Sequence, residues 1–228
     1  MLRGLFRSEG YKKRFWRKIL FQLPKTEATF NLFCVNKAVM PYRPPGEPLK
    51  PRFDAGEFGG VYKAILKHAP RTSSELRHPL VDVGPGIFAG DFLAGMRRHH
   101  YPRTPMSVIG LEPNTAFHGH IADSVEGVHI LNESVQQFLH DHPQAREKVP
   151  VVVVKHIYDS DLLSHAQRVS LTEGLSHMPA PDGVIAVQVN SDKLHLLPTE
   201  AELGRLGLET VDTIEHSWGP VKVWRKKS

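Results

Sequence analysis

Short apolar segments alternate with helical patterns between residues 80 and 189, and this alternation constrains the fold more than any other feature. The segments that predict strands are Leu80–Val83, Ser107–Leu111, Val128–Leu131, Val151–Val154 and Gly183–Val189. The segments that predict helices are Gly90–His99, Ala116–Ser124, Ser134–His140 and Leu162–His177. Strands that are apolar throughout and are followed by helices are typical of a parallel sheet with helices on both faces. We therefore expect an α/β fold with a mostly parallel sheet.

The C-terminal part of the chain breaks this alternation. A short helix is predicted at Glu200–Leu206, followed by strands at Glu209–His216 and Val221–Arg225. The turn Trp218-Gly219-Pro220 separates the two strands by only a few residues, too few for a crossover helix. The sheet should therefore end in an antiparallel strand pair.

Positive charge is concentrated at the N-terminus. Residues 1–25 hold eight Lys and Arg against one Glu, a net charge of +7, so the remaining residues carry −2 of the total of +5. Phe15, Trp16, Ile19 and Leu20 form one apolar stripe of a helix among these cations. This basic leader is typical of a mitochondrial transit peptide, an RNA- or partner-binding arm, a membrane-surface helix, or a helix docked on the domain. It lacks the apolar centre of a secretory signal.

An extension at residues 26–78 links the leader to a domain predicted at residues 79–228. Its segment Met40–Pro51 contains five prolines and cannot be helical. A helix is predicted from the N-cap Asp54 to His68, with an apolar face toward the domain. The members of that face are Phe58, Val61, Tyr62, Ile65 and Leu66. We expect this extension to be a lid or docking segment.

Composition excludes several classes of protein. The only cysteine, Cys34, rules out an internal disulfide framework and a cysteine-rich zinc site, and it suits a reducing compartment such as the cytoplasm. No apolar run approaches the ~20 residues of a membrane-spanning helix. The histidine pairs 118/120 and 140/142 have a spacing that points to different faces of a helix. No metal site is therefore predicted.

A glycine-containing loop follows the first predicted strand. Gly84 and Gly86 in Asp82-Val83-Gly84-Pro85-Gly86 allow a tight turn and a close approach of ligand to backbone, at the strand end where open parallel sheets bind ligands. The loop also fits a loose dinucleotide fingerprint. However, the carboxylate of Asp82 would repel the diphosphate of NAD and attract a cation such as the ammonium or sulfonium of S-adenosylmethionine.

With these residues the sequence resembles the class I S-adenosylmethionine-dependent methyltransferases, which have a Rossmann-like fold. The resemblance covers Pro79–Lys227 and extends to Gly110-Leu111-Glu112-Pro113-Asn114, Asn132-Glu133-Ser134 and the strand and loop Val151–Asp161. The closing antiparallel pair is also a habit of that family. The resemblance implies the fold and the cofactor, and says almost nothing about the substrate.

The resemblance also implies roles for single residues. Gly84 and Gly86 would cradle the methionine part of the cofactor, with Asp82 near its ammonium. Glu112 would accept both ribose hydroxyls. Glu133, followed by Ser134, would face the adenine amine; Glu133 is equally typical of an acid that begins a helix.

The sequence departs from the family pattern in two places. Phe88 stands where the loop commonly has a third glycine, and Pro150-Val151 stands where the fourth strand often begins with an acid. These departures favour a second hypothesis beside the enzyme. In it the chain is a non-catalytic methyltransferase-fold assembly factor or structural subunit of a mitochondrial ribonucleoprotein particle such as the ribosome.

The loop after the fourth strand, Lys155-His156-Ile157-Tyr158-Asp159-Ser160-Asp161, would face the methyl acceptor. It lacks the Asn/Asp-Pro-Pro-aromatic tetrapeptide of amino-methylating nucleic-acid enzymes and the cysteine of cytosine-C5 enzymes. His156 could remove a proton from the acceptor, which makes His156 and Asp159 the candidate catalytic residues. Alternatively, His156 packs at the strand end and Asp159 or Ser160 caps the next helix.

Together these observations predict an S-adenosylmethionine-dependent methyltransferase that acts on RNA, a protein or a small molecule. The leader predicts a mitochondrial location, or else a cytoplasmic one, and a contact with RNA or a ribonucleoprotein. An NAD-dependent reductase is disfavoured because of Asp82.

Overall fold

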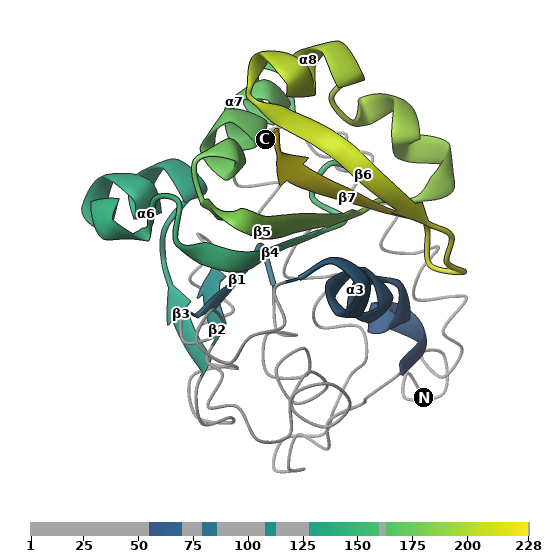
Figure 1. The fold of residues 1–228 in the computed structure, drawn as a ribbon, viewed down its shortest axis with the longest axis horizontal. Coiled ribbons are helices and arrows are strands. Elements are labelled where there is room, and N and C mark those ends of the chain that lie inside the picture. Colours follow the sequence, from purple (N-terminus) through teal and green to yellow (C-terminus); the bar gives the residue numbers. More distant parts are fainter. Residues whose placement is uncertain (1–54, 70–78, 86–107, 113–127, 160–162, 228) are drawn as a thin grey trace, which may run out of the picture. The chain divides into compact units, whose positions relative to one another are not determined.

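A seven-stranded sheet forms the centre of the part of the chain that the computed structural model describes, residues 55–69, 79–85, 108–112, 128–159 and 163–227 (Figure 1). The strands are β1 (Leu80–Val83), β2 (Val108–Leu111), β3 (Val128–Leu131), β4 (Val149–Lys155), β5 (Pro179–Gln188), β6 (Leu208–Ile214) and β7 (Val221–Lys226). The helices are α3 (Ala55–His68), α6 (Val135–Asp141), α7 (His165–Ser176) and α8 (Glu200–Arg205), with 3₁₀ turns η3 (Pro143–Ala145) and η4 (Ser191–Leu196).

The strand order is β3-β2-β1-β4-β5-β7-β6. Strands β1 to β5 are parallel, and β7 runs antiparallel to both β5 and β6. This confirms the mostly parallel sheet and the antiparallel C-terminal pair. The chain order reverses beside β1, where β2 and β4 lie on opposite sides of it, and such switch points are the usual ligand sites of open α/β sheets.

The two faces of the sheet carry separate hydrophobic clusters. On one face α3 packs with alternate residues of β1, β4 and β5, among them Val151, Val153 and Val184. On the other, Val152 and Val154 of β4 pack with α6, α7 and α8. Because successive residues of a strand point to opposite faces, β4 is apolar throughout and supplies both clusters. Helices therefore cover both faces, as the sequence predicts.

Helix α3 belongs to the core of the sheet. Val61, Tyr62 and Ile65 are buried against it, as the predicted apolar face requires, whereas Leu66 is 40% exposed and its assignment to that face was wrong. Ala64 takes the buried place instead. The domain boundary at residue 79 stays a prediction, but the residues of α3 and β1 share one cluster.

Strand β4 begins two residues earlier than the sequence predicts and includes Pro150. Its register with β5 shifts between Val149 and Val151, so Pro150 lies at an irregularity where the missing N–H breaks no ladder bond. The close approach of β5 to β4 at this point also requires glycine at position 183, since a Cβ there would lie 2.7 Å from the carbonyl oxygen of Val149.

Several predictions lie outside the described residues: the leader, the proline segment, the N-cap Asp54, Gly86, and the helices expected at 90–99 and 116–124. Among the helices that the structure describes, none is long and apolar enough to cross a membrane.

Candidate functional site

Charged side chains lie where the parallel strands end. Asp82 of β1 is 3% exposed, and Glu112, directly after β2, is 6% exposed. Burial raises the pKa of Asp82 to about 7; the positive charge of Lys155 at the end of β4 lowers this pKa, and the charge of Glu112 raises it further. The sequence predicts both carboxylates here, but it gave no sign that Lys155 is the cation beside Asp82.

Gly84 begins the loop after β1 in a left-handed conformation, with φ +64°. Its N–H donates to the carbonyl of Leu111 at 2.9 Å, which extends the β1–β2 pairing by one residue. A Cβ at this position would lie 2.7 Å from Cδ1 of Ile157. Backbone conformation and space therefore both require glycine at the start of the loop.

Glu133 and Ser134 follow β3 at the same edge. The Ser134 hydroxyl caps α6 by accepting from the N–H of Gln137 at 3.2 Å. One oxygen of Glu133 lies 3.8 Å from Nε2 of His142, and its other oxygen is buried with no hydrogen-bond partner among the described residues. Both residues lie near the start of a helix, and their contact with a cofactor stays a prediction.

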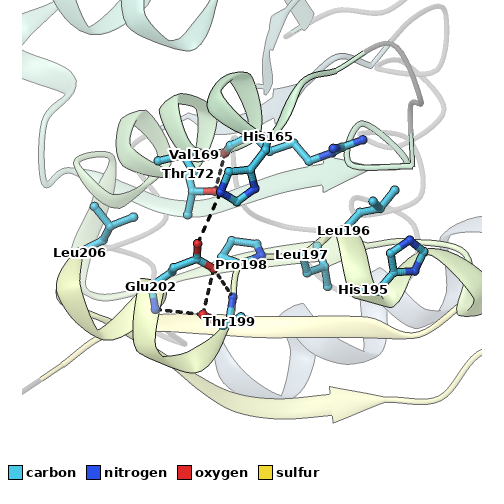
Figure 2. Close-up of a pocket in the computed structure, with 11 residues that line it drawn as sticks. His165, Val169, Thr172, His195, Leu196, Leu197, Pro198, Thr199, Glu202 and Leu206 are labelled. Atoms are coloured by element: carbon cyan, nitrogen blue, oxygen red, sulfur yellow. Dashed lines mark hydrogen bonds and ion pairs between the residues drawn. The ribbon is translucent and has the colours of Figure 1, made fainter.

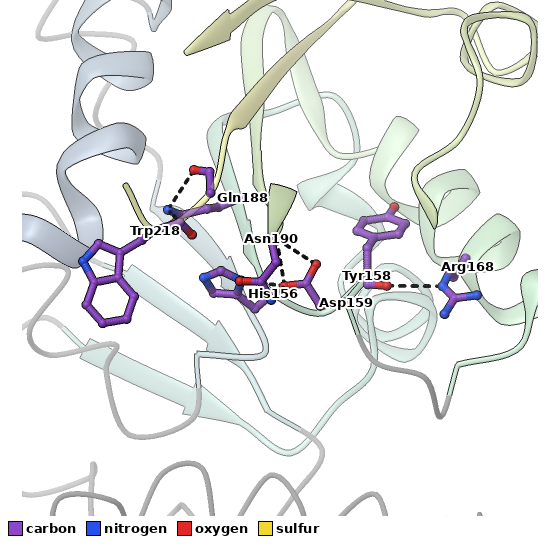
Figure 3. Close-up of polar contacts among 8 residues, drawn as sticks. His156, Tyr158, Asp159, Arg168, Gln188, Asn190 and Trp218 are labelled. Carbon is purple, nitrogen blue, oxygen red and sulfur yellow. Dashed lines mark hydrogen bonds and ion pairs between the residues drawn. The ribbon is translucent and has the colours of Figure 1, made fainter. Parts of the chain in front are cut away.

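His156 and Asp159 form a hydrogen-bonded pair after β4 (Figure 3). The His156 Nδ1 lies 2.7 Å from Oδ2 of Asp159, and the two side chains are 17% and 5% exposed. Since an ionised carboxylate only accepts, the contact places an N–H on Nδ1, and in the neutral form of the ring the lone pair then lies on Nε2. His156 also has φ +59°, a conformation that costs a non-glycine residue ~1–2 kcal/mol.

Asn190, just after β5, holds the Asp159 carboxylate and is a site residue that the sequence did not predict. Its Nδ2 donates to Oδ2 at 2.6 Å, and its backbone N–H lies 3.0 and 3.1 Å from the two oxygens. These contacts join residues 31 positions apart, and the only sequence signal was a polar residue directly after a strand. The alternative that Asp159 or Ser160 caps the next helix was wrong, because Ser164 caps α7.

Tyr158, which lies in the loop expected to face an acceptor, belongs to the core. It is fully buried, contacts Trp224 edge to face, and its hydroxyl lies 2.7 Å from Oγ1 of Thr172. Burial raises the pKa of this hydroxyl far above its ordinary value. Tyr158 therefore anchors the loop that carries His156 and Asp159.

The strand order divides the site into two halves. Asp82, Gly84 and Glu112 lie at the ends of β1 and β2, whereas His156 and Asn190 follow β4 and β5. Because β4 is the direct neighbour of β1, the His156–Asp159 pair lies beside the glycine loop. The arrangement offers a buried acidic region next to an oriented imidazole.

A groove of about 210 Å³ lies apart from these residues, between α7, η4 and α8 (Figure 2). His165 and Glu202 face each other across it at 3.7 Å, and the Glu202 carboxylate is already bonded to Thr199 in the capping box of α8. Ligand pockets usually measure ~300–1,000 Å³. The groove holds none of the candidate site residues, so the strand ends remain the better candidate.

No cluster of three or more His, Cys, Asp or Glu side chains that could hold a metal ion occurs within the described ranges.

The sequence matches no family model and no curated protein. Solved structures do match. The N-methyltransferase NodS from Bradyrhizobium japonicum is 13% identical, with a TM-score of 0.53 over 77% of this chain and 97% of NodS. A TehB-like SAM-dependent methyltransferase from Corynebacterium glutamicum is 14% identical, with a TM-score of 0.51 over 74% and 88%. A variant of LepI, in complex with SAH and a substrate analogue, is 12% identical, with a TM-score of 0.56 over 88% and 54%.

The chain has the class I methyltransferase fold. The resemblance seen in the sequence is confirmed at the level of structure. At this level of identity the likeness shows the fold alone, and folds host unrelated reactions. The chain spans about half the length of LepI.

Proposed function

We propose that the protein is an S-adenosylmethionine-dependent methyltransferase whose acceptor is RNA, a protein or a small molecule. The observation that carries this proposal is the pairing of two buried carboxylates, Asp82 and Glu112, with the oriented His156 at neighbouring strand ends of a methyltransferase fold. The presence of SAH in the structural neighbour LepI supports the choice of cofactor.

The residues at the ends of β1 and β2 fit this cofactor chemically. Asp82 and Glu112 are acceptors that suit an ammonium and a ribose diol, and Gly84 allows the left-handed turn that begins the loop beside them. When bound, S-adenosylmethionine would supply an activated methyl group. Gly86, Glu133 and Ser134 would complete the cofactor-binding residues.

His156 would act on the acceptor. Its Nε2 carries the free lone pair and can take the proton of a hydroxyl or amine, while Asp159 fixes the ring through Nδ1. Asn190 fixes Asp159 in turn. Methyl transfer also depends on holding the reactants in line, which rigid neighbouring strand ends can provide.

Calorimetry with S-adenosylhomocysteine tests cofactor binding. We expect the ligand to bind and NAD to bind far more weakly. Glu112→Ala should weaken binding by about 1–3 kcal/mol, the cost of losing a charged acceptor. Glu209→Ala, which removes an exposed carboxylate on β6, is the matched control. Binding of NAD together with no detectable binding of S-adenosylhomocysteine would contradict the proposal.

Transfer of a labelled methyl group to RNA, protein and small-molecule fractions tests catalysis. His156→Ala and Asp159→Asn should reduce transfer while leaving the affinity for S-adenosylhomocysteine unchanged, because neither residue lies at the ends of β1 and β2. Methyl transfer by Asp159→Asn should depend on pH differently from transfer by the wild type, since the amide no longer selects the tautomer of the His156 ring. Full transfer by His156→Ala would remove this residue from the mechanism.

We also propose that the basic leader directs the protein to mitochondria or binds RNA. The second candidate function is a non-catalytic assembly factor or subunit of a mitochondrial ribonucleoprotein particle. The observation that favours it is the concentration of cationic residues in positions 1–25. A folded Gly86→Val variant that cannot bind cofactor but restores the function of cells lacking the gene would support this candidate. Failure of the variant to restore that function would support the enzyme.

A further inference from the structure

An indole lies exposed near the candidate site. Trp218, in the turn between β6 and β7, is 48% exposed, more than any other large hydrophobic side chain that the structure describes. The other tryptophan in the described ranges, Trp224, is 1% exposed. A tryptophan presents a wide ring at small conformational cost, and tryptophan is enriched at contact surfaces.

The turn that carries Trp218 is fixed on the end of β5. The backbone N–H of Trp218 donates to Nδ1 of His216 at 3.3 Å, and the backbone N–H of Val189 donates to the carbonyl of Pro220 at 3.3 Å. Gly219 has φ +103°, and a Cβ on it would lie 2.0 Å from the carbonyl oxygen of Val189. Trp218 is therefore held by a tightly packed turn.

The same end of β5 holds the His156 pair. The backbone carbonyl of Gln188 accepts a hydrogen bond from the backbone N–H of His156 at 2.8 Å. The buried side-chain amide nitrogen of Gln188 lies 3.5 Å from the carbonyl oxygens of Trp218 and Gly219. Asn190, two residues on, binds Asp159. Figure 3 shows Gln188 between Trp218 and the His156–Asp159 pair.

The sheet sets the spacing between the backbone positions of His156 and Trp218. His156 follows β4 and Trp218 precedes β7, with β5 between them. Neighbouring strands are ~4.8 Å apart, so the two positions are about 10 Å apart along the edge of the sheet. A ring system with a substituent can span that distance.

We propose that Trp218 is the platform on which the methyl acceptor lies, and that the acceptor is a planar aromatic or heteroaromatic compound whose hydroxyl or amine reaches His156. This inference rests on the proposed function and names its substrate class. The flat face of the indole would select a ring by stacking, and its turn lies on β5, which β4 separates from the cofactor residues of β1 and β2.

The test uses the full-length ¹⁵N-labelled protein and follows its indole N–H resonances by NMR, with Trp218→Phe assigning the resonance of Trp218. The probe is 2-naphthol, and its saturated analogue decahydro-2-naphthol keeps the hydroxyl without the flat ring. We expect 2-naphthol to shift the Trp218 resonance and leave that of buried Trp224 in place. Equal shifts with the saturated alcohol, or none with either, would overturn the proposal.

Variants separate a role in binding from a role in folding. Trp218→Ala should weaken 2-naphthol binding roughly 2- to 12-fold, the loss that a stacked ring pair implies, while Trp218→Phe retains part of the affinity and both variants keep the wild-type melting temperature. Gly219→Ala should displace the turn and weaken binding although the indole is present. Val169→Ala, which alters a 40% exposed residue of α7, is the matched control and should bind as the wild type does.

Further samples distinguish other sources of the ring and other occupants. A short oligouridine that also shifts the Trp218 resonance would assign the ring to a nucleic-acid base. A shift with anionic vesicles but with neither alcohol nor oligouridine would make Trp218 a lipid contact and overturn the proposal. S-adenosylhomocysteine binding without any naphthol shift defeats this inference alone, whereas naphthol binding without S-adenosylhomocysteine binding defeats the proposed cofactor.

Discussion

At the scale of single residues, burial decides the charge of Asp82. Its pKa is raised from 3.8 to about 7, so the folded protein keeps a proton that the unfolded chain has already lost. The contribution of Asp82 to the free energy of unfolding is therefore largest in acid and is lost as pH rises toward and through 7. A bound cationic ligand would reverse the preference of buried Asp82 for its protonated form, because a positive charge favours the ionised carboxylate.

Asp82→Asn should consequently raise the free energy of unfolding at pH 8 by on the order of 1–3 kcal/mol and change it much less at pH 5. Urea unfolding at both pH values measures the difference. In the same variant the affinity for S-adenosylhomocysteine should lose its rise between pH 6 and 8. A stability difference that is the same at both pH values would contradict the assignment.

The backbone of His156 offers a second residue-scale prediction. His156→Gly relieves the cost of φ +59°, whereas His156→Ala keeps it, and both lose the bond to Asp159. The glycine variant should therefore be more stable than the alanine variant by about 1 kcal/mol. Thermal unfolding of the two purified proteins measures this difference, and equal stabilities would show that the segment relaxes without glycine.

At the scale of elements, Asp212 of β6 ties the C-terminal end of α3 to the sheet. Its Oδ2 lies 2.7 Å from Nε2 of His68 and 2.8 Å from Nζ of Lys67. Arg225 of β7 donates to the carbonyl of His68 at 2.7 Å, which caps the same helix end. Hydrogen bonds from Lys67 and His68 hold the pKa of Asp212 well below its usual range.

Asp212→Asn should lower the free energy of unfolding at pH 7 by about 1 kcal/mol. Because the pKa of Asp212 is lower in the folded state, its contribution is present above pH ~4 and is lost as pH falls below that value. Variant and wild type should therefore converge in stability as the solution becomes strongly acidic. Glu209→Ala, which removes an exposed carboxylate of the same strand, is the control with little expected effect.

At the scale of the whole molecule, two truncations, one that keeps α3 and one that removes it, test which N-terminal residues the fold needs. Deleting residues 1–25 should leave the melting temperature nearly unchanged if the leader is an address that the domain does not use for folding. Deleting residues 1–78 should prevent cooperative unfolding, because it removes Val61 and Ile65, both fully buried in the sheet cluster. Circular dichroism melts compare the two, and a stable protein starting at residue 79 would place α3 outside the folding unit.

The leader makes a further prediction for the whole protein. Fusing residues 1–23 to a reporter should send the reporter to mitochondria if the leader is a transit peptide. If it is an RNA arm, removing it should abolish most of the salt dependence of RNA binding. A cytosolic reporter would end the targeting hypothesis, and salt-independent RNA binding by the truncated protein would end the other.

The sequence by itself determined the order of the strands and α-helices that the structure describes, but not the 3₁₀ turns η3 and η4. Period-two and period-3.6 apolar patterns are local, so the sequence predicts Leu80–Val83 and Val128–Leu131 with the bounds that the structure shows. Parallel strands end at one edge of a sheet, so the positions of Asp82, Gly84 and Glu112 at strand ends already predict that they are neighbours. The strand pairing confirms that edge.

Only the tertiary structure decided what surrounds those residues. The raised pKa of Asp82 follows from burial between strands, and Asn190 reaches Asp159 because β4 pairs with β5. Trp218 comes beside the site because β7 returns along β5, which brings the Gln188 amide to the Trp218 carbonyl across 30 residues of sequence. These contacts depend on distances through space, and a local apolar pattern carries no information about them.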